Sequence, residues 1–420
     1  MLPPSGGAKT ATPQGDDIIS VPMVGIEPTY LTVHDFESCA SANSATSAST
    51  VQYIQSYLKG QGIIMRLGII GLPQSGKTTL FNALTRGTQP TGAGSGKMEV
   101  HTAVVDVPDA RVDKLSEMFL PKKTVYAKVT YTDIAGLDGS AGKSGISGTL
   151  LNHLTQMDGL IHVVRCFEDD NVPHPLGSVD PLRDIASMDS EFLLNDLIAV
   201  ERKLEKLNEE KKKGAGRDKG LIERELELFT RFHAALSAET PLRDIAIDAE
   251  EDKLLSGFGF LSRKPILLVL NLAEGQSAPE LTYAHQHAMV VALQARLEMD
   301  IAQLPPDEAQ AFLAEYGIEE PSLNRMIKLS YDLLGLESFF TAGQDECRAW
   351  TIRRGATAPE AAGEIHTDLQ KGFIRAEVVA YTDLMALGSL AEAKAKGKLR
   401  LEGKEYIVKD GDVLNIRFAL

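Results

Sequence analysis

Residues 65–80 read MRLGIIGLPQSGKTTL, and this stretch decides the fold. From Gly71 to Thr78 it fits the pattern GxxxxGK[ST], in which glycines let backbone N–H groups curl around phosphates. Lys77 is expected to reach the β- and γ-phosphates, and the Thr78 hydroxyl to ligate Mg²⁺. An apolar run leads in and a helical segment leads out, so a helix N-terminus faces the phosphates. The predicted nucleotide-binding residues here are Gly71, Pro73, Gln74, Ser75, Gly76, Lys77, Thr78 and Thr79.

A second motif follows the apolar stretch Val125–Ile134. Residues 133–136 read DIAG, a DxxG sequence at the end of a predicted core strand. Asp133 is expected to hold Mg²⁺ through water, and the Gly136 amide to sense the γ-phosphate. Thr78 and Asp133 are therefore the predicted metal ligands. Lys77 and Gly136 are the predicted catalytic residues of these two motifs.

A third polar segment ends the strand Pro265–Leu270. It reads Asn271-Leu272-Ala273-Glu274, where a guanine-reading site would have NKxD. The Lys is missing and Glu replaces the Asp that accepts from guanine N1–H and N2–H₂. Asn271 can still hydrogen-bond a purine. Asn271 and Glu274 are predicted to lie beside the base, and the motif favours ATP or relaxed specificity.

Six short apolar runs indicate buried strands. Their limited polar alternation favours a parallel sheet covered on both faces, hence a three-layer α/β domain with a mainly parallel sheet. The runs are Ile63–Ile70, Ala103–Val107, Val125–Ile134, Gly159–Phe167, Pro265–Leu272 and Ala288–Leu293.

The pattern changes between Asp189 and Phe260. Apolar residues recur there at heptad spacing and continue after a basic, glycine-containing turn that includes Lys211–Lys213. The arrangement predicts an antiparallel α-helical hairpin inserted in the α/β domain. It is either a solvated arm or an arm that contacts a large partner. The residues of the two helices are Leu193, Leu197, Val200, Leu204, Leu207, Ile222, Leu226, Phe229 and Leu236.

From Phe339 onward, short strands, turn signals and one helix indicate a compact α+β module. Its acidic and basic residues balance, although the whole chain carries 58 Asp and Glu against 43 Lys and Arg, a net charge of −15. A basic strip opposes Glu402 alone, and it is either a solvated hairpin or an RNA contact. The strip is Lys394, Lys396, Lys398, Arg400 and Lys404.

Composition excludes several other classes. The overall acidity argues against DNA binding through bulk charge. Cys39, Cys166 and Cys347 lie far apart without a CxxC motif, which argues against structural zinc and disulfides and favours the cytoplasm. No apolar run reaches the roughly 18–20 residues that span a bilayer. Residues 1–64 are expected to be disordered or a gene-calling extension before a natural start at Met65.

With these residues in view, the chain resembles the YchF/Obg-like ATPase family of translation-factor-class P-loop NTPases. The resemblance runs from Met65 to Leu420. Beyond the P-loop it rests on Leu160–Glu168, Glu320–Ile327 and Phe339–Gly343, and on the C-terminal runs Arg348–Gly355, Ala356–His366, Lys371–Ala376 and Tyr406–Asp412. It implies a P-loop NTPase domain over 65–188 and 261–338, a helical coiled-coil insert over 189–260, and a ubiquitin-like TGS domain over 339–420.

The same resemblance implies function. It suggests an ATP-preferring, Mg²⁺-dependent ATPase that associates with ribosomes, with rRNA or tRNA contacted through the TGS domain. Asn271 and Glu274 correspond to the family's NxxE base-reading loop. Leu137 stands where a Ras-like NTPase has its water-orienting Gln, so another group is needed. His174 corresponds to a loop histidine of the family and is a candidate for that catalytic role.

The sequence also departs from the family. Gln74 replaces the Asn often tied to a monovalent cation, which puts dependence on K⁺ in doubt. Residues 94–100 and 136–151 diverge from the two switch segments, and the spacing does not secure Thr102 as the Mg²⁺-sensing Thr. These changes suggest altered or slow hydrolysis. A nucleotide-gated ribosome or RNA regulator with negligible turnover and a true GTPase remain open, whereas a small-molecule kinase is disfavoured because no acceptor-site pattern is recognisable.

Overall fold

The computed structural model describes residues 65–89, 100–134, 146, 148–214, 216–315, 318 and 320–419. It also gives the backbone of two short antiparallel strands, β1 (Ile19–Ser20) and β2 (Tyr30–Leu31). The expectations for residues 1–64 otherwise lie outside the described part. The chain divides into two compact units, Met1–Leu58 and Lys59–Leu420. The second unit holds both predicted domains and the helical arm.

A six-stranded sheet forms the centre of the first layered domain, in the order β4-β6-β3-β7-β8-β9. Each pair of neighbours is parallel except β4, which runs antiparallel to β6. All six apolar runs become strands, and the mainly parallel sheet is confirmed. The strands are β3 (Arg66–Ile70), β4 (Val100–Asp106), β6 (Lys128–Ile134), β7 (Gly159–Arg165), β8 (Ile266–Asn271) and β9 (Ala288–Leu293).

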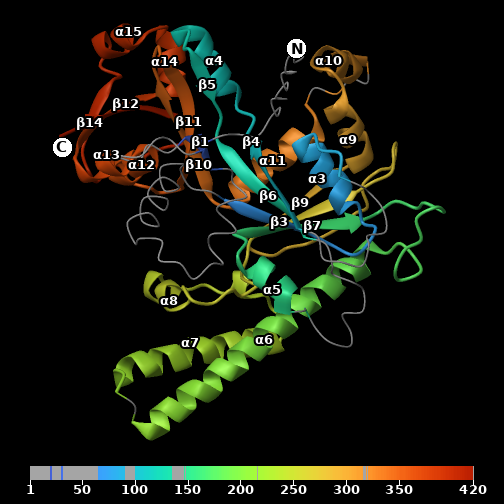
Figure 1. The fold of residues 1–420 in the computed structure, drawn as a ribbon. Coiled ribbons are helices and arrows are strands. Elements are labelled where there is room, and N and C mark those ends of the chain that lie inside the picture. The colour runs from blue at the N-terminus through green and yellow to red at the C-terminus, as the bar shows by residue number, and fades with distance from the viewer. Residues whose placement is uncertain are drawn as a thin grey trace, which may run out of the picture. The chain divides into compact units, whose positions relative to one another are not determined.

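Helices cover both faces of this sheet, as Figure 1 shows. One apolar cluster joins strand residues to α3 (Lys77–Thr85), α9 (Ala295–Gln303) and α11 (Ser322–Leu333). Another joins the opposite face to α5 (Gly148–Thr155) and the first turns of α6 (Pro181–Lys213). The predicted three-layer architecture is therefore confirmed. The short helices α8 (Ala249–Leu254) and α10 (Pro306–Glu315) complete this part.

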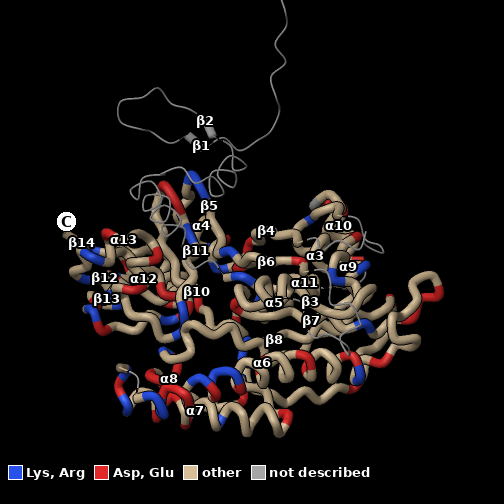
Figure 2. The backbone as a smooth tube through the Cα atoms, turned by 60° about the horizontal axis from the view of Figure 1, so that its bottom comes forward, with Lys and Arg blue, Asp and Glu red and all other residues tan. Residues whose placement is uncertain are grey.

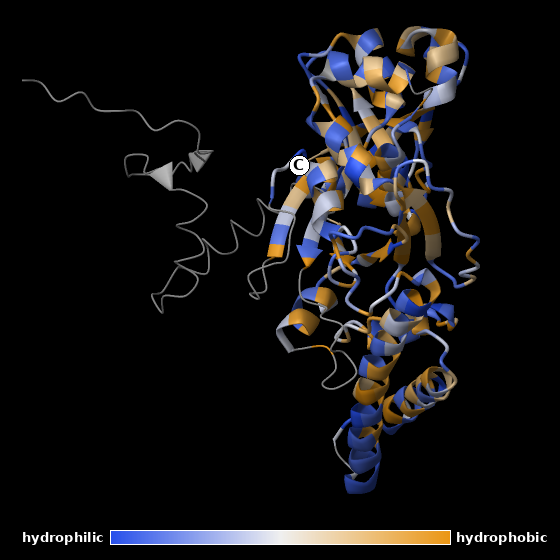
Figure 3. Ribbon diagram, turned by 90° about the vertical axis from the view of Figure 1, so that its right-hand side faces the viewer, coloured by the Kyte–Doolittle hydropathy of each residue, from blue (hydrophilic) through white to orange (hydrophobic). Residues whose placement is uncertain are grey.

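The helical arm is a hairpin of α6 and α7 (Lys219–Ser237), which pack side by side and end in a hydrophilic tip (Figures 1 and 3). Its apolar seam forms one cluster that contains all nine predicted positions. The first helix begins at Pro181, ahead of the predicted boundary at Asp189. At the root, Asp196 is fully buried and accepts from the amides of Leu261 and Ser262. The arm is therefore anchored in the NTPase domain by a buried carboxylate.

The C-terminal module holds a second six-stranded sheet in the order β13-β12-β14-β10-β11-β5. Within residues 336–419 it has four helices instead of the one predicted. The elements are β10 (Leu336–Ala342), β11 (Glu346–Arg353), α12 (Ala358–Ile365), α13 (Thr367–Lys371), β12 (Phe373–Ala380), α14 (Tyr381–Leu387), α15 (Leu390–Ala395), β13 (Arg400–Glu402) and β14 (Asp412–Phe418).

The sixth strand of that sheet, β5 (Lys123–Val125), comes from the NTPase part of the chain and pairs in parallel with β11. The helix before it, α4 (Ala110–Phe119), packs on β10 and β11. The sequence pattern had merged Val125 into the strand that comes after it. The second sheet is thus not built from C-terminal residues alone, and the predicted domain boundaries stay predictions. Among the described residues, no helix is both long and apolar enough to cross a membrane.

Candidate functional site

Two glycines of the phosphate loop are required by their surroundings. Gly71 has φ +147°, and a Cβ atom there would lie 2.4 Å from the carbonyl oxygen of Val163. Gly76, the residue before α3, has φ +97°, and a Cβ atom would lie 2.2 Å from Nδ2 of Asn271. Side chains do not fit at either position. The loop between β3 and α3 therefore packs too closely at these two positions for any residue other than glycine.

Gln74 sits in the left-handed region, with φ 62°, and is exposed. A non-glycine residue pays about 1–2 kcal/mol for this conformation, and such strain gathers at functional sites. The next residue, Ser75, has a buried hydroxyl without a hydrogen-bond partner in the described structure. Pro73 and Thr79 flank this part, in the loop and in the first turn of α3. The middle of the loop thus combines a strained backbone with a buried hydroxyl that lacks a partner in the described structure, as functional loops often do.

The Lys77 ammonium lies across the loop from which it projects. It is buried and donates to the carbonyl oxygens of Gly71 at 3.1 Å and Leu72 at 2.8 Å. Its charge therefore rests at the loop that was predicted to hold phosphates. The contact of Lys77 with the β- and γ-phosphates stays a prediction.

Thr78 and Asp133 meet although they are far apart in the sequence. The Thr78 hydroxyl donates to Oδ2 of Asp133 at 2.9 Å. The other carboxylate oxygen, Oδ1, is buried without a partner among the described residues. Burial raises the pKa of Asp133, while the Thr78 hydrogen bond and the charges of Lys77 and His101 oppose that shift. A hydroxyl and an orphaned carboxylate oxygen are ligands that suit Mg²⁺, so the residues present fit this ion.

His101 is a neighbour of this pair that sequence reasoning missed. It lies on β4 directly opposite Asp133 on β6, and it contributes a favourable charge to that carboxylate. Only the antiparallel register of β4 brings it there, so no local motif signalled it. Thr102, the next residue, is exposed and its hydroxyl lies 3.2 Å from that of Thr132. The structure thus places Thr102 in the sheet and not with the Thr78–Asp133 pair.

Asn271 holds three elements together. Its Nδ2 donates to the carbonyl of Ser75 at 3.0 Å, and its Oδ1 accepts from the amide of Ala295 at 3.0 Å. The residue is 5% exposed. It therefore ties the end of β8 to the phosphate loop and to the start of α9. After these bonds, one amide hydrogen and one carbonyl lone pair remain for a ligand.

The loop after Asn271 is fixed by Gln276, which no sequence pattern pointed to. Its Oε1 accepts from the amide of Ala273 at 2.8 Å, and its Nε2 donates to the carbonyl of Cys166 at 2.7 Å. Glu274, in the turn between them, is exposed. The loop is thus pinned to the end of β7, and Glu274 is left facing solvent.

An aromatic ring also lies at this end of the sheet. Phe167 follows β7, and the buried guanidinium of Arg165 stacks on it, 4.5 Å from the ring centroid. Arg165 is the register partner of Asn271 on β8. The Phe167 ring is only partly buried. The Phe167 ring therefore lies at the same end of the sheet as Asn271, a position that no sequence motif indicated.

His174 is held elsewhere. Its Nδ1 accepts from the amide of Leu176 at 3.1 Å, which leaves the proton on Nε2 to donate to Asp184 at 3.0 Å. Its side chain is 3% exposed. Neither bond involves the phosphate loop or Asp133, and the catalytic role of His174 stays a prediction. Gly136 and Leu137 lie outside the described residues, and their roles stay predictions.

The phosphate loop, the Thr78–Asp133 pair and the mainly parallel sheet define a P-loop NTPase. Two family models agree. The model MMR_HSR1, described as "50S ribosome-binding GTPase", matches residues 66–212. The model YchF-GTPase_C, described as "Protein of unknown function (DUF933)", matches residues 336–419.

Curated relatives span most of the chain. "Ribosome-binding ATPase YchF" of Bacillus subtilis is 43% identical over 363 residues, which cover 84% of this chain and 98% of the relative. "Obg-like ATPase 1" of Caenorhabditis elegans is 35% identical over 370 residues, 85% of this chain and 93% of the relative. A solved structure of the Schizosaccharomyces pombe YchF GTPase superposes with a TM-score of 0.71 at 28% identity, over 85% and 98% of the two chains. The chain belongs to the YchF family.

Proposed function

We propose that this chain is a Mg²⁺-dependent ATPase that binds ribosomes. The observation that carries the proposal is the contact of Thr78 with Asp133, with a buried carboxylate oxygen unpaired beside the phosphate loop. Thr78 and Asp133 would hold the ion. The printed names of relatives that align over 84% of the chain, "Ribosome-binding ATPase YchF", support both halves of the proposal.

The chemistry would be positioning and electrostatic stabilisation. Lys77 and the N–H groups of the loop Gly71–Thr78 bind and orient the phosphates, and the Gly136 amide is proposed to sense the last of them. Mg²⁺, when bound, neutralises charge on the β- and γ-phosphates. Leu137 cannot orient a water molecule by hydrogen bonding, and His174 is bonded to Asp184. These residues support slow hydrolysis, and they also favour a second candidate, a nucleotide-gated regulator with negligible turnover.

We propose that ATP is preferred over GTP. Leu272 and Glu274 replace the residues with which NKxD reads guanine, and Glu274 points to solvent at the end of a pinned loop. Asn271 keeps one donor and one acceptor for a purine edge. The Phe167 ring accepts either purine, so it adds affinity without discrimination. A GTPase is the remaining alternative at this site.

The C-terminal module supplies the proposed RNA contact, to rRNA or tRNA, in the cytoplasm, with no role for DNA or a membrane. The basic strip predicted from the sequence is exposed at Lys394, Lys396, Lys398 and Lys404. Figure 2 shows Lys and Arg together with Asp and Glu around β12, β13 and β14. On this sheet Arg375 stands opposite Arg417, whose guanidinium is paired with Glu377.

Single-turnover phosphate release tests the enzyme. Wild-type protein is compared with Lys77→Ala, with ATP and GTP, with and without ribosomes and K⁺. We expect slow release from ATP that ribosomes accelerate and that the substitution abolishes together with tight ATP binding. No release above the Lys77→Ala background under any condition selects the non-hydrolysing regulator. A GTP preference above tenfold selects the GTPase, and unchanged ATP affinity in Lys77→Ala refutes the site.

Ribosome co-sedimentation at several salt concentrations tests the partner surface. We expect Lys396→Glu with Lys398→Glu to weaken binding and to flatten its salt dependence, because fewer counterions are released. The matched control is the same charge reversal at Lys211 and Lys212, near the tip of the arm. Loss of binding only in the arm variant would place the contact on the arm and contradict the proposed strip.

A further inference from the structure

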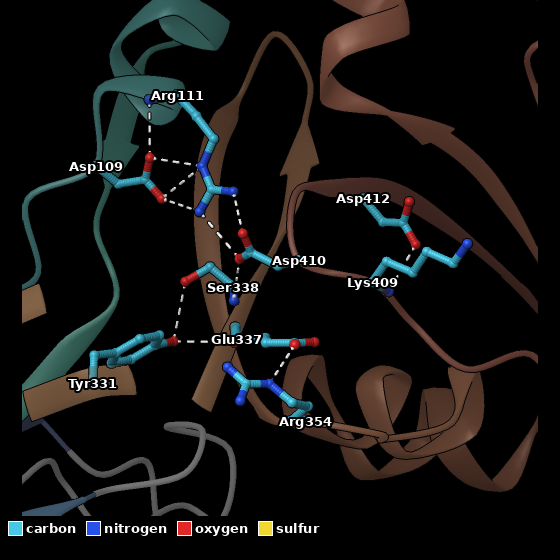
Figure 4. Close-up of polar contacts among 9 residues, drawn as sticks. All are labelled: Asp109, Arg111, Tyr331, Glu337, Ser338, Arg354, Lys409, Asp410 and Asp412. Atoms are coloured by element: carbon cyan, nitrogen blue, oxygen red, sulfur yellow. Dashed lines mark hydrogen bonds and ion pairs between the residues drawn. The ribbon is translucent and has the colours of Figure 1, made fainter. Parts of the chain in front are cut away.

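A turn of the C-terminal module, Lys409-Asp410-Gly411-Asp412, docks on the NTPase part of the chain. Figure 4 shows Asp410 beside Arg111, which lies in the first turn of α4. The guanidinium binds this carboxylate with two hydrogen bonds, at 2.7 Å and 3.2 Å. Two further N–H groups of the guanidinium donate to Asp109, at 2.8 Å and 2.9 Å. A two-pronged guanidinium–carboxylate pair fixes direction as well as distance.

The two sides of this contact are themselves fixed. Asp109 caps α4 by accepting from the Arg111 amide, and the Arg111 side chain lies over the Phe340 ring, 5.0 Å from its centroid. On the other side, the amide of Ser338 donates to Asp410 at 3.1 Å and the amide of Gly411 to Ser338 at 2.8 Å. Gly411 has φ +86°, and a Cβ atom there would lie 3.2 Å from the guanidinium. The turn is thus shaped to let Arg111 approach.

Burial alone lowers the pKa of Arg111, but its bonds to Asp109 and Asp410 outweigh that effect and raise it. The Arg111 guanidinium therefore stays positively charged at neutral pH. Apolar contacts reinforce the pair, because Val112 and Leu115 of α4 share a buried cluster with Phe340 and Val413 of the module. Pairing of β5 with β11 adds backbone hydrogen bonds. Segment 110–125 and the C-terminal module are therefore packed together, and the same apolar cluster continues into the NTPase domain at Ile69 and Met326.

The polypeptide connects this packed region directly to the strands of the proposed metal site. Strand β4 ends just before α4, and β6 begins just after β5. The two strands pair along their whole length, from Asp106 opposite Lys128 to His101 opposite Asp133. Asp133 therefore stands at one end of this strand pair, and the segment that packs on the module leaves from the other end. The strand β6 also pairs with β3 in the same sheet, up to Asp133.

We infer that the contact between Arg111 and Asp410 is a latch that couples the nucleotide state at Thr78 and Asp133 to the position of the C-terminal module. The inference rests on the proposed ATPase function, since it needs two nucleotide states. It assigns the Lys409–Asp412 turn to intramolecular docking. By linkage, a latch that differs between the ATP and ADP states also changes the relative affinity for the two nucleotides.

Hydrogen exchange tests the latch at the amides of Ser338 and Gly411. Wild-type protein is saturated with Mg²⁺ and either ADP or a non-hydrolysable ATP analogue. We expect the exchange rates of these amides to differ between the nucleotides by about fivefold or more, the lower end of usual allosteric coupling. In Asp410→Asn and in Arg111→Lys the difference should fall below about twofold. The ratio of the two dissociation constants, from calorimetry, should shift by a matching factor.

The matched control is Lys122→Ala. It removes an ion pair across the same interface, Lys122 with Asp345, but both side chains are largely exposed, at 82% and 88%. It should behave as wild type. Equal exchange rates in the two nucleotides while calorimetry shows binding would overturn the latch and leave the proposed function standing. The latch is equally overturned if Asp410→Asn and Arg111→Lys, both folded by thermal unfolding, keep the wild-type difference. Absence of nucleotide binding by the wild-type protein would refute the proposed function and the latch with it.

Discussion

Replacement of Asn271 by Ala should loosen the phosphate loop before any nucleotide is present. The substitution removes the donor to the Ser75 carbonyl and the acceptor for the Ala295 amide, both at 3.0 Å in a buried place. A buried polar group left unpaired costs about 1–3 kcal/mol. For the Ala295 amide alone, that corresponds to exchange with solvent about 5- to 150-fold faster, since about 1.4 kcal/mol is a factor of ten.

Native-state hydrogen exchange of the Ala295 amide, without nucleotide, measures this cost directly. Asn271→Asp is the comparison variant, because it keeps an oxygen for the Ala295 amide while it replaces the donor to Ser75 by a carboxylate oxygen. We expect rapid exchange in Asn271→Ala, near wild-type exchange in Asn271→Asp, and weakened ATP binding in both. Exchange within about twofold of wild type in Asn271→Ala would show that the side chain acts on the base alone and that the reasoning about the brace is wrong.

Three further outcomes are expected from the geometry. Gly71→Ala should lower the free energy of unfolding by about 2 kcal/mol or more, because its Cβ would lie 2.4 Å from the Val163 carbonyl oxygen. The control is Gly216→Ala, which has open space around it and should leave the melting temperature unchanged. Burial raises the pKa of Asp133, so its ionised carboxylate destabilises the metal-free fold as pH rises. Asp133→Asn should therefore melt at a higher temperature than wild type at about pH 7.5, with a smaller gain at about pH 4.5, and should lose Mg²⁺-dependent ATP binding. A melting temperature below that of wild type at the higher pH would contradict this sign. Asp196→Ala should lower the free energy of unfolding by about 3 kcal/mol or more, because two backbone amides and the Ser262 hydroxyl lose their buried acceptor. It should also make the root of the arm sensitive to limited proteolysis. Unchanged resistance to the protease would show that the arm is held by its apolar seam alone.

The sequence predicted those parts of the fold that depend on local pattern. The apolar runs became the strands of the first sheet, and the heptad spacing became the seam of the arm. The phosphate loop was recognisable because its glycines answer a local steric need, which the close approach of Gly71 to Val163 displays. Asp133 was recognisable because a strand end beside a phosphate loop is where a metal ligand belongs.

Short elements without periodicity were missed. The strand β5 has three residues, and its partner β11 lies more than 200 positions further along the chain. The helix α13 has five residues, too few to show a helical pattern. The sequence pattern therefore merged β5 with the next strand and indicated one helix in a module that has four within residues 336–419. Both errors arise because tertiary pairing, and not local preference, decides these elements.

The roles of polar side chains were the least predictable. Asn271 was expected at the base, and the structure shows it bracing Ser75 and Ala295 as well. His174 was a candidate for the catalytic role, and the structure adds that its ring is bonded to Asp184. Each depends on which groups the fold brings within reach of a side chain. His101 and Gln276 show the converse, since both lie at the candidate site and neither belongs to a motif.

The strand β5 has a consequence for anyone who divides this protein. The C-terminal family model begins at residue 336, yet β5 and α4 complete the sheet and core of that module. A fragment cut at residue 336 would leave the edge of β11 uncovered, and an uncovered edge invites pairing with another chain. Such a fragment should aggregate, or exchange strands with a second copy, although its sequence looks like an independent unit. The segment that relatives share as a sequence unit and the unit that folds are therefore different pieces of the polypeptide.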